Sequence, residues 1–336
     1  MHSERKIGRS TGMERRNSID LLRIISAVAI VVIHTVSTPV ANSPVDIDAS
    51  LWCNLYRIHA LMNWAVPVFF MITGYCLLKK PSLTYQYVFT HIWKYVCVLF
   101  TVGFAYGLMG EVFEHQTVNV SIVLQALKNV ISGQLWDHMW FVYAIIGIYL
   151  VMPVIHLFMH QNERNAVILT ALLFVFNILL PALEEVLPVG VKLSFDEYLF
   201  YVCMGGLLAS RKLSKKWTLA IYLAGILALG WICFIWKYWE LGYRHPAVCA
   251  MAVSIFLLVS NLDIKPGKML LGLSCCTWGV YLIHPFFINV AIRLLGIDAL
   301  GSHAYLKHLA LLGAVLAASF GTTWVLRKIP VVKKLF

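Results

Sequence analysis

The sequence predicts an all-α fold: a polytopic membrane helix bundle of about ten transmembrane helices, with both termini in the cytoplasm. Hydrophobic residues make up 60% of the chain and charged residues only 13%, whereas a soluble protein carries about 25% charged residues. The mean hydropathy is +0.78. The apolar residues gather into runs close to the ~20 residues that cross a bilayer. These observations place most of the chain in lipid.

The apolar runs, taken in chain order, define the predicted spans. The sixth and eighth runs are short, which bilayer thinning or burial inside the bundle accommodates. We place the spans at about residues 19–38, 58–78, 87–109, 138–158, 166–182, 195–210, 217–236, 246–261, 274–294 and 305–326.

Charge in the connecting segments supports this count. With the N-terminus inside, 18 of the 27 Lys and Arg residues fall in cytoplasmic segments and 7 in outer segments, as the positive-inside rule predicts. Dropping one span would move the last basic cluster outside. An even number of spans therefore fits, and we expect a multi-pass protein of the cell inner (plasma) membrane.

The chain is expected to hold one membrane domain, residues 18–328, between cytoplasmic tails at 1–17 and 329–336. No polar stretch reaches the ~50 residues of a soluble domain. The first apolar run carries Arg23 and His34, so we do not expect a cleavable signal peptide. In the longest outer loop, Val120–Ile131 has helical spacing and is expected to lie on the membrane surface.

The remaining composition excludes two partner classes. The net charge is +11, but its distribution follows the membrane asymmetry, so we expect no nucleic-acid partner. The eight cysteines contain no C-x-x-C pair and no Cys/His spacing of the zinc type. We therefore expect no metal site.

The first span carries the most informative pattern, Asp20, Arg23 and His34. Arg23 and His34 are eleven residues apart, about 20° past three full helical turns, so they share one face about 16 Å apart along the axis. Asp20 lies three residues before Arg23 on the same face. One side of this helix thus presents a cation at the cytoplasmic mouth and an imidazole deep in the membrane.

Each residue alone also has a simple structural explanation. His34 fits a buried histidine bonded to neighbouring backbone, and Arg23 fits a snorkelling anchor paired with Asp20. Ionisable residues within a membrane helix are costly, however, and mark functional sites. The shared face favours function: a neutral imidazole acts as a general base, and an arginine at the mouth holds a phosphate.

Four motifs resemble acyltransferase family 3, in that family's order. The first is D-L-L-R followed, after ten intervening residues, by His34. The others are V-P-V-F-F-M-I-T-G-Y ending at Tyr75, H-M-W-F-V-Y-A starting at His138, and G-V-Y-L-I-H-P containing His284. The pattern is most similar to the branch of the enterobacterial common antigen O-acetyltransferase. Two positions depart from the family: Ile145 stands where some branches have glutamate, and His91 to Lys94 stand where many have Arg-x-x-Arg.

The resemblance implies an enzyme that moves an acyl group from a cytoplasmic acyl-CoA, most often acetyl-CoA, to a hydroxyl of a cell-surface glycan or its lipid-linked precursor. Membrane lipid, the glycan acceptor and acyl-CoA are the expected partners, with no bound cofactor. The expected roles are catalysis for His34, Arg23 and Asp20, donor binding for Arg23, His91 and Lys94, and substrate lining for His138, Trp140, Tyr149, Gly74, Tyr75 and His284.

Several of these residues keep alternative interpretations. Gly74 with Tyr75 also fits close helix packing, and His138 with Trp140 also fits the interfacial aromatic belt. His91 and Lys94 also fit interface anchors. His284 precedes a proline, so we expect a helix break there, of the kind tolerated beside a cavity.

Two other functional classes remain open. A small-molecule or glycan transporter also places His and Arg along a pathway through the membrane, although the sequence shows no inverted repeat and no matching pair of broken spans. A receptor or structural subunit would need no histidine deep in the membrane and would tolerate replacement of both Arg23 and His34.

Overall fold

Eight helices of the computed structural model, among the residues it describes, are long and apolar enough to cross a membrane. Two shorter apolar helices, Tyr198–Ala209 and Pro246–Ser260, match the predicted sixth and eighth spans. The structure describes residues 16–42, 48–186, 197–210, 213–236 and 241–336, and this part of the chain contains no β-strand. The predicted all-α polytopic bundle is confirmed.

The helices follow one another with short connections. In chain order they are α1 (Asn17–Ala41), α2 (Ala49–Met62), α3 (Ala65–Leu78), α4 (Tyr85–Val98), η1 (Leu99–Gly103), α5 (Phe104–His115), α6 (Val120–Ser132), η2 (Asp137–Met139), α7 (Trp140–Gln161), α8 (Glu163–Phe174), η3 (Val175–Leu179), α9 (Leu180–Val186), α10 (Glu197–Ser210), α11 (Lys215–Phe234), α12 (Pro246–Ser260), α13 (Lys268–Asn289), η4 (Val290–Leu294), α14 (Ala304–Leu326) and η5 (Val332–Lys334).

Two predicted spans were too short, because the helices continue through polar residues beyond the predicted boundaries. The second span begins at Ala49 and not near residue 58. Arg57 donates a hydrogen bond to Asn54 Oδ1 at 3.0 Å, so the two side chains bond to each other one turn apart on the helix. The third span likewise extends to His115, beyond the predicted end at residue 109.

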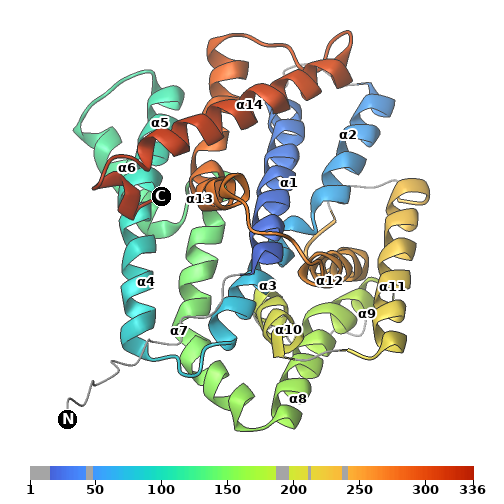
Figure 1. Ribbon diagram of the computed structural model, residues 1–336. Coiled ribbons are helices and arrows are strands. Elements are labelled where there is room, and N and C mark those ends of the chain that lie inside the picture. Colours follow the sequence, from blue (N-terminus) through green and yellow to red (C-terminus); the bar gives the residue numbers. More distant parts are fainter. Residues whose placement is uncertain (1–15, 43–47, 187–196, 211–212, 237–240) are drawn as a thin grey trace, which may run out of the picture.

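The bundle has a buried centre and an exposed periphery. The most apolar windows of α1 and of the span containing α13 are each 61% buried, against 17% for α11 and 22% for α14. Figure 1 shows α1 in the middle of the bundle between α13 and α2, with α11 at one edge. The peripheral helices therefore offer their apolar faces to lipid, whereas α1 is enclosed by protein.

Glycine allows α3 and α10 to cross with their backbones in contact. A Cβ on Gly74 would lie 1.8 Å from the carbonyl oxygen of Val202, and a Cβ on Gly205 would lie 2.0 Å from that of Met71. No side chain fits at either position unless the helices separate. This is the close packing of small residues that membrane helices use in place of a hydrophobic driving force.

The last residues pack against the bundle. The indole of Trp278 donates a hydrogen bond to the carbonyl of Leu335 at 2.9 Å, and Phe336 is buried. The predicted C-terminal tail thus lies against α13, while its cytoplasmic location remains a prediction. The predicted N-terminal tail falls outside the described residues except at its last two positions.

The amphipathic segment of the long loop is helical, as its spacing predicts. It forms α6, which packs against α5. Asn129 donates a hydrogen bond to Glu111 Oε1 of α5 at 2.6 Å. Its expected place on the membrane surface remains a prediction.

Candidate active site

The N-terminal end of α1 carries a buried ion pair. Asp20 is 1% exposed and accepts a hydrogen bond from Arg23 at 3.0 Å and another from Ser274 of α13 at 2.6 Å. Arg23 also donates to the sulfur of Cys76 on α3 at 3.3 Å. The guanidinium is thereby held between three helices, which fixes its position at the mouth of the bundle.

The helix is continuous from Arg23 to His34, so the two residues are separated by about 16 Å along its axis. His34 lines a cavity of about 520 Å³, and Arg23 lies outside that lining. The lining reaches Asn42 at the C-terminal end of α1, the end predicted to be outer. Its polar and aromatic lining residues include His34, Tyr56, His59, Asp137, His138, Trp140, Tyr243 and Tyr281.

Three imidazoles meet beside this cavity. The ring centroid of His34 lies 5.1 Å from that of His284 and 6.5 Å from that of His138. The rings of His138 and His284 are 5.8 Å apart. In the part of the chain that the structure describes, no group of three or more His, Cys, Asp or Glu is placed to hold a metal ion. The three rings offer several nitrogen atoms for proton transfer within one protected space.

Tyrosine hydroxyls hold the backbone around the imidazoles. Tyr281 donates a hydrogen bond to the carbonyl of His138, and Tyr106 donates one to the carbonyl of Leu282 at 2.8 Å. The first bond joins α13 to η2 and the second joins α13 to α5. The positions of His138 and His284 are therefore set by neighbouring helices.

The expected helix break at His284 is wrong. Helix α13 runs from Lys268 to Asn289 and passes through Pro285. A proline leaves the carbonyl four residues earlier without its helical donor, but a buried helix tolerates this where its neighbours compensate. The bond from Tyr106 to the adjacent carbonyl of Leu282 supplies such a contact in this turn.

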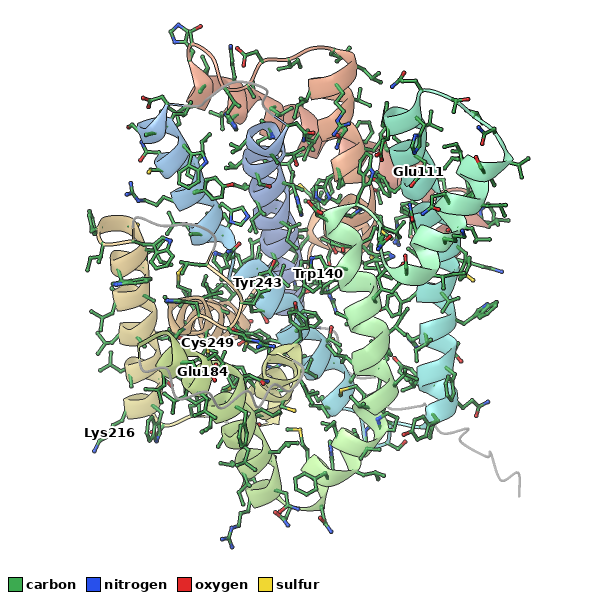
Figure 2. The ribbon with its side chains drawn as sticks, turned by 180° about the vertical axis from the view of Figure 1, so that it is seen from behind. Glu111, Trp140, Glu184, Lys216, Tyr243 and Cys249 are labelled. Atoms are coloured by element: carbon green, nitrogen blue, oxygen red, sulfur yellow. The ribbon has the colours of Figure 1, made fainter. Side chains whose placement is uncertain are left out.

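An aromatic wall forms another side of the cavity. The indole of Trp140 stacks on Tyr198 with centroids 5.1 Å apart and lies 5.8 Å from the ring of Tyr243. Figure 2 shows Trp140 and Tyr243 close together near the middle of the bundle. Both line the cavity. The wall thus has flat apolar faces next to a few polar groups, a combination common in binding pockets.

Four of the six predicted lining residues, Gly74, Tyr75, Tyr149 and His284, do not line this cavity. Gly74 sits at the crossing of α3 and α10 described above. Tyr75 is buried with its ring 6.3 Å from that of Phe256, and Lys79 approaches its hydroxyl at 3.5 Å. Neither residue lines the cavity. The structure therefore gives both residues positions that serve helix packing.

Tyr149 and His91 come together in a second group, away from the cavity lining. Their rings are stacked 5.9 Å apart, and the ring of Tyr95 lies 5.5 Å from Tyr149 and 5.5 Å from Trp278. His91 Nδ1 donates to the carbonyl of Tyr87 at 2.8 Å. This aromatic group connects α4, α7 and α13.

Lys94 brings a further positive charge to α4. It is partly buried and lies within electrostatic range of Arg327. Arg327 donates hydrogen bonds to the carbonyl oxygens of Cys275 at 2.6 Å and Phe336 at 3.0 Å. Arg23 lies near the start of α1 and Arg327 directly follows α14, at ends that are predicted to be cytoplasmic, whereas Lys94 lies deeper, in the second half of α4.

Sequence reasoning missed several residues that the structure adds to these two groups. His59, Tyr243 and Tyr281 line the cavity, and Arg327 neighbours Lys94. Tyr281 lies inside the quoted G-V-Y-L-I-H-P motif, so its motif was a usable signal. Arg327 belongs to the last basic cluster, which the sequence explains by topology alone, and nothing in the local sequence marks His59 or Tyr243.

Comparison with known proteins gives one partial relative and one family. The chain is 34% identical over 146 residues to an amino-acid racemase of Enterococcus faecalis, a match that covers 41% of this chain and 19% of that protein. The chain thus spans about a fifth of the length of that relative. No solved structure matches. The family model described as an acyltransferase domain matches residues 16–328, nearly the whole chain, and the chain therefore belongs to acyltransferase family 3.

Proposed function

We propose that the protein is an O-acetyltransferase of the inner membrane, which moves acetyl from cytoplasmic acetyl-CoA to a hydroxyl of a surface glycan or its lipid-linked precursor. The observation that carries this proposal is the placement of Arg23 and His34 on one continuous helix, with His34 on a cavity and Arg23 outside it. A helix of this kind holds the two ends of a long, thin donor.

The donor binds by its phosphates at the mouth. Coenzyme A carries several phosphate charges, and guanidinium groups bind phosphate in a bidentate manner. Arg23 is held in place by Asp20, and Lys94 and Arg327 add positive charge. The pantetheine arm then spans the distance of about 16 Å to His34, which brings the thioester to the cavity.

The acceptor hydroxyl binds in the cavity beside His34. Trp140 and Tyr243 offer flat faces to a sugar ring, and the polar groups of the lining offer hydrogen bonds. The likeness of the sequence to the common antigen branch favours a sugar on a lipid carrier. Such an acceptor reaches the cavity from the membrane and leaves its hydroxyl beside the imidazole.

In the direct mechanism the acetyl group passes from the thioester sulfur to the hydroxyl oxygen in one transfer. As the hydroxyl oxygen attacks the thioester carbon, His34 takes its proton. The tetrahedral intermediate expels the coenzyme A thiolate, and His34 donates to this thiolate the proton that it took from the hydroxyl. One ester forms, one thioester breaks, and the imidazole returns to its neutral state.

A covalent variant of this mechanism uses the same residues. One nitrogen of His34 attacks the thioester carbon, the proton of the other nitrogen passes to the departing thiolate, and an acyl-histidine and the coenzyme A thiol result. The hydroxyl oxygen then attacks the acyl carbon, and the imidazole leaves with the proton of the hydroxyl. The two routes differ in kinetics, because only the covalent route gives ping-pong behaviour.

The test is transfer of labelled acetyl from acetyl-CoA to the lipid-linked and polysaccharide fractions in membranes. Wild type and His34→Ala are compared at matched expression. We expect label with wild type alone. If wild type fails with a panel of acyl-CoAs as well as with acetyl-CoA, the proposed donor is wrong and transport becomes the better explanation.

A further inference from the structure

The imidazole of His284 has one nitrogen engaged and one free. Its side chain is fully buried, and Nδ1 lies 3.0 Å from the carbonyl of Val280 in the preceding turn of α13. A carbonyl only accepts, so Nδ1 carries the proton. In the neutral ring Nε2 is then an acceptor, and it has no hydrogen-bond partner among the described residues.

His34 lacks the group that usually orients a catalytic imidazole. No hydrogen bond to either ring nitrogen of His34 is made within the described ranges of the chain. A base that must point one nitrogen at a substrate is normally held by a partner on the other nitrogen. The free nitrogen of His284 and the unheld ring of His34 thus complement each other.

The separation of the rings allows them to bond. An N–H···N hydrogen bond of about 3 Å between two imidazoles puts their centroids about 5 Å apart, and the His34 and His284 centroids are 5.1 Å apart. Rotation of the His34 ring about its broad χ2 torsion brings an N–H toward Nε2. His138, at 6.5 Å, is too far away for the same contact.

We propose that His284 is a positioning residue: its Nε2 accepts a hydrogen bond from His34 and leaves the other nitrogen of His34 as the base that faces the cavity. The proposal rests on the acyl transfer proposed above. His284 does not line the cavity, so it acts through His34. When His34 takes the proton of the hydroxyl, the same bond stabilises the resulting imidazolium.

Two substitutions of His284 separate this role from packing. In His284→Asn the amide reaches the position of Nδ1 and keeps the bond to Val280, but nothing replaces Nε2. In His284→Gln the longer amide places an oxygen near the position of Nε2. We expect kcat to fall about 10- to 100-fold in His284→Asn, with an unchanged KM for acetyl-CoA, and to recover to within about threefold of wild type in His284→Gln.

The chain offers a matched control in α14. His308 is buried, its Nδ1 donates to the carbonyl of Ala304 at 2.8 Å, and its Nε2 lacks a partner in the described structure. It does not line the cavity. We expect His308→Asn to keep the wild-type kcat, and thermal melting in detergent checks that all variants are folded.

A second measurement decides the inference without the transfer assay. Diethyl pyrocarbonate reacts with the unprotonated imidazole nitrogen, and mass spectrometry gives the modification rate at His34. We expect a slower rate in His284→Asn, and a wild-type rate in His284→Gln and His308→Asn. An equal rate at His34 in all four proteins, or equal loss of kcat in both His284 variants, overturns the proposal. Absence of transfer by wild type, with the expected modification rates, overturns the proposed function alone.

Discussion

The two ends of α1 satisfy their polar groups in opposite ways. At the N-terminal end Asp20 and Arg23 bond to each other and to α13 and α3. Around His34 the neighbouring imidazoles of His138 and His284 each keep a nitrogen without a hydrogen-bond partner in the described structure. A satisfied ion pair holds its side chains in place, whereas a nitrogen without a partner can still bond to His34 or take part in proton transfer. The difference assigns binding to one end of the helix and proton transfer to the other.

The largest expected effect comes from removing the base. His34→Gln keeps a polar side chain of similar size but cannot take a proton. We expect kcat to fall about 10²–10⁴-fold, the usual contribution of general acid–base catalysis, while the Kd of acetyl-CoA stays unchanged. Initial rates and equilibrium binding on purified protein measure both, with His308→Gln as the control. Weakened acetyl-CoA binding in His34→Gln would contradict the assignment of binding to one end of α1 and proton transfer to the other.

The next largest effect is expected from removing the charges of the Asp20–Arg23 ion pair. Arg23→Gln alone removes the positive charge beside the buried carboxylate of Asp20, which is itself destabilising, so the double variant Asp20→Asn with Arg23→Gln is preferable. We expect the KM for acetyl-CoA to rise about 10- to 100-fold from loss of a charged hydrogen bond to phosphate, with kcat within about threefold. The exposed Arg164→Gln on α8 is the control. A collapse of kcat at saturating donor would contradict the assignment.

A structural variant distinguishes loss of function from loss of fold. In Gly74→Ala the new methyl meets the carbonyl of Val202, and overpacking of this kind costs about 1–3 kcal/mol. Gly147→Ala, where nothing lies within 4 Å, is the matched control and removes only glycine's helix penalty. We expect Gly74→Ala to melt at lower temperature with kcat and KM per folded molecule unchanged. A selective change in either constant would place Gly74 in the site.

The smallest effect is expected at Arg327. Its hydrogen bonds to the carbonyls of Cys275 and Phe336 keep it beside Lys94. Because these bonds use part of its N–H groups, fewer are left to bind phosphate. We expect Arg327→Gln to raise the KM for acetyl-CoA about threefold through the lost charge. The exposed Lys333→Gln, measured in the same assay, is expected to behave as wild type. A rise as large as that of the Arg23 double variant would make Arg327 a second anchor.

The helical architecture was predictable because each span needs a continuous apolar run, which composition records directly. The pairing of Asp20 with Arg23 followed from their spacing on one turn. The contacts of His284 could not be predicted from the sequence. Local sequence predicted a helix break before Pro285, whereas neighbouring helices keep this turn intact. His59 and Tyr243 reach the cavity only through the packing of α2 and the segment before α12, and no periodicity in their own segments marks that.

A structure of the protein with a thioether analogue of acetyl-CoA tests most directly the claim that α1 holds both ends of the donor. We predict that the phosphates contact Arg23 and that the acyl carbonyl lies in the cavity beside His34. Phosphates bound instead near Asn42 and Arg293, which are bonded to each other at the other end of the bundle, would contradict the account.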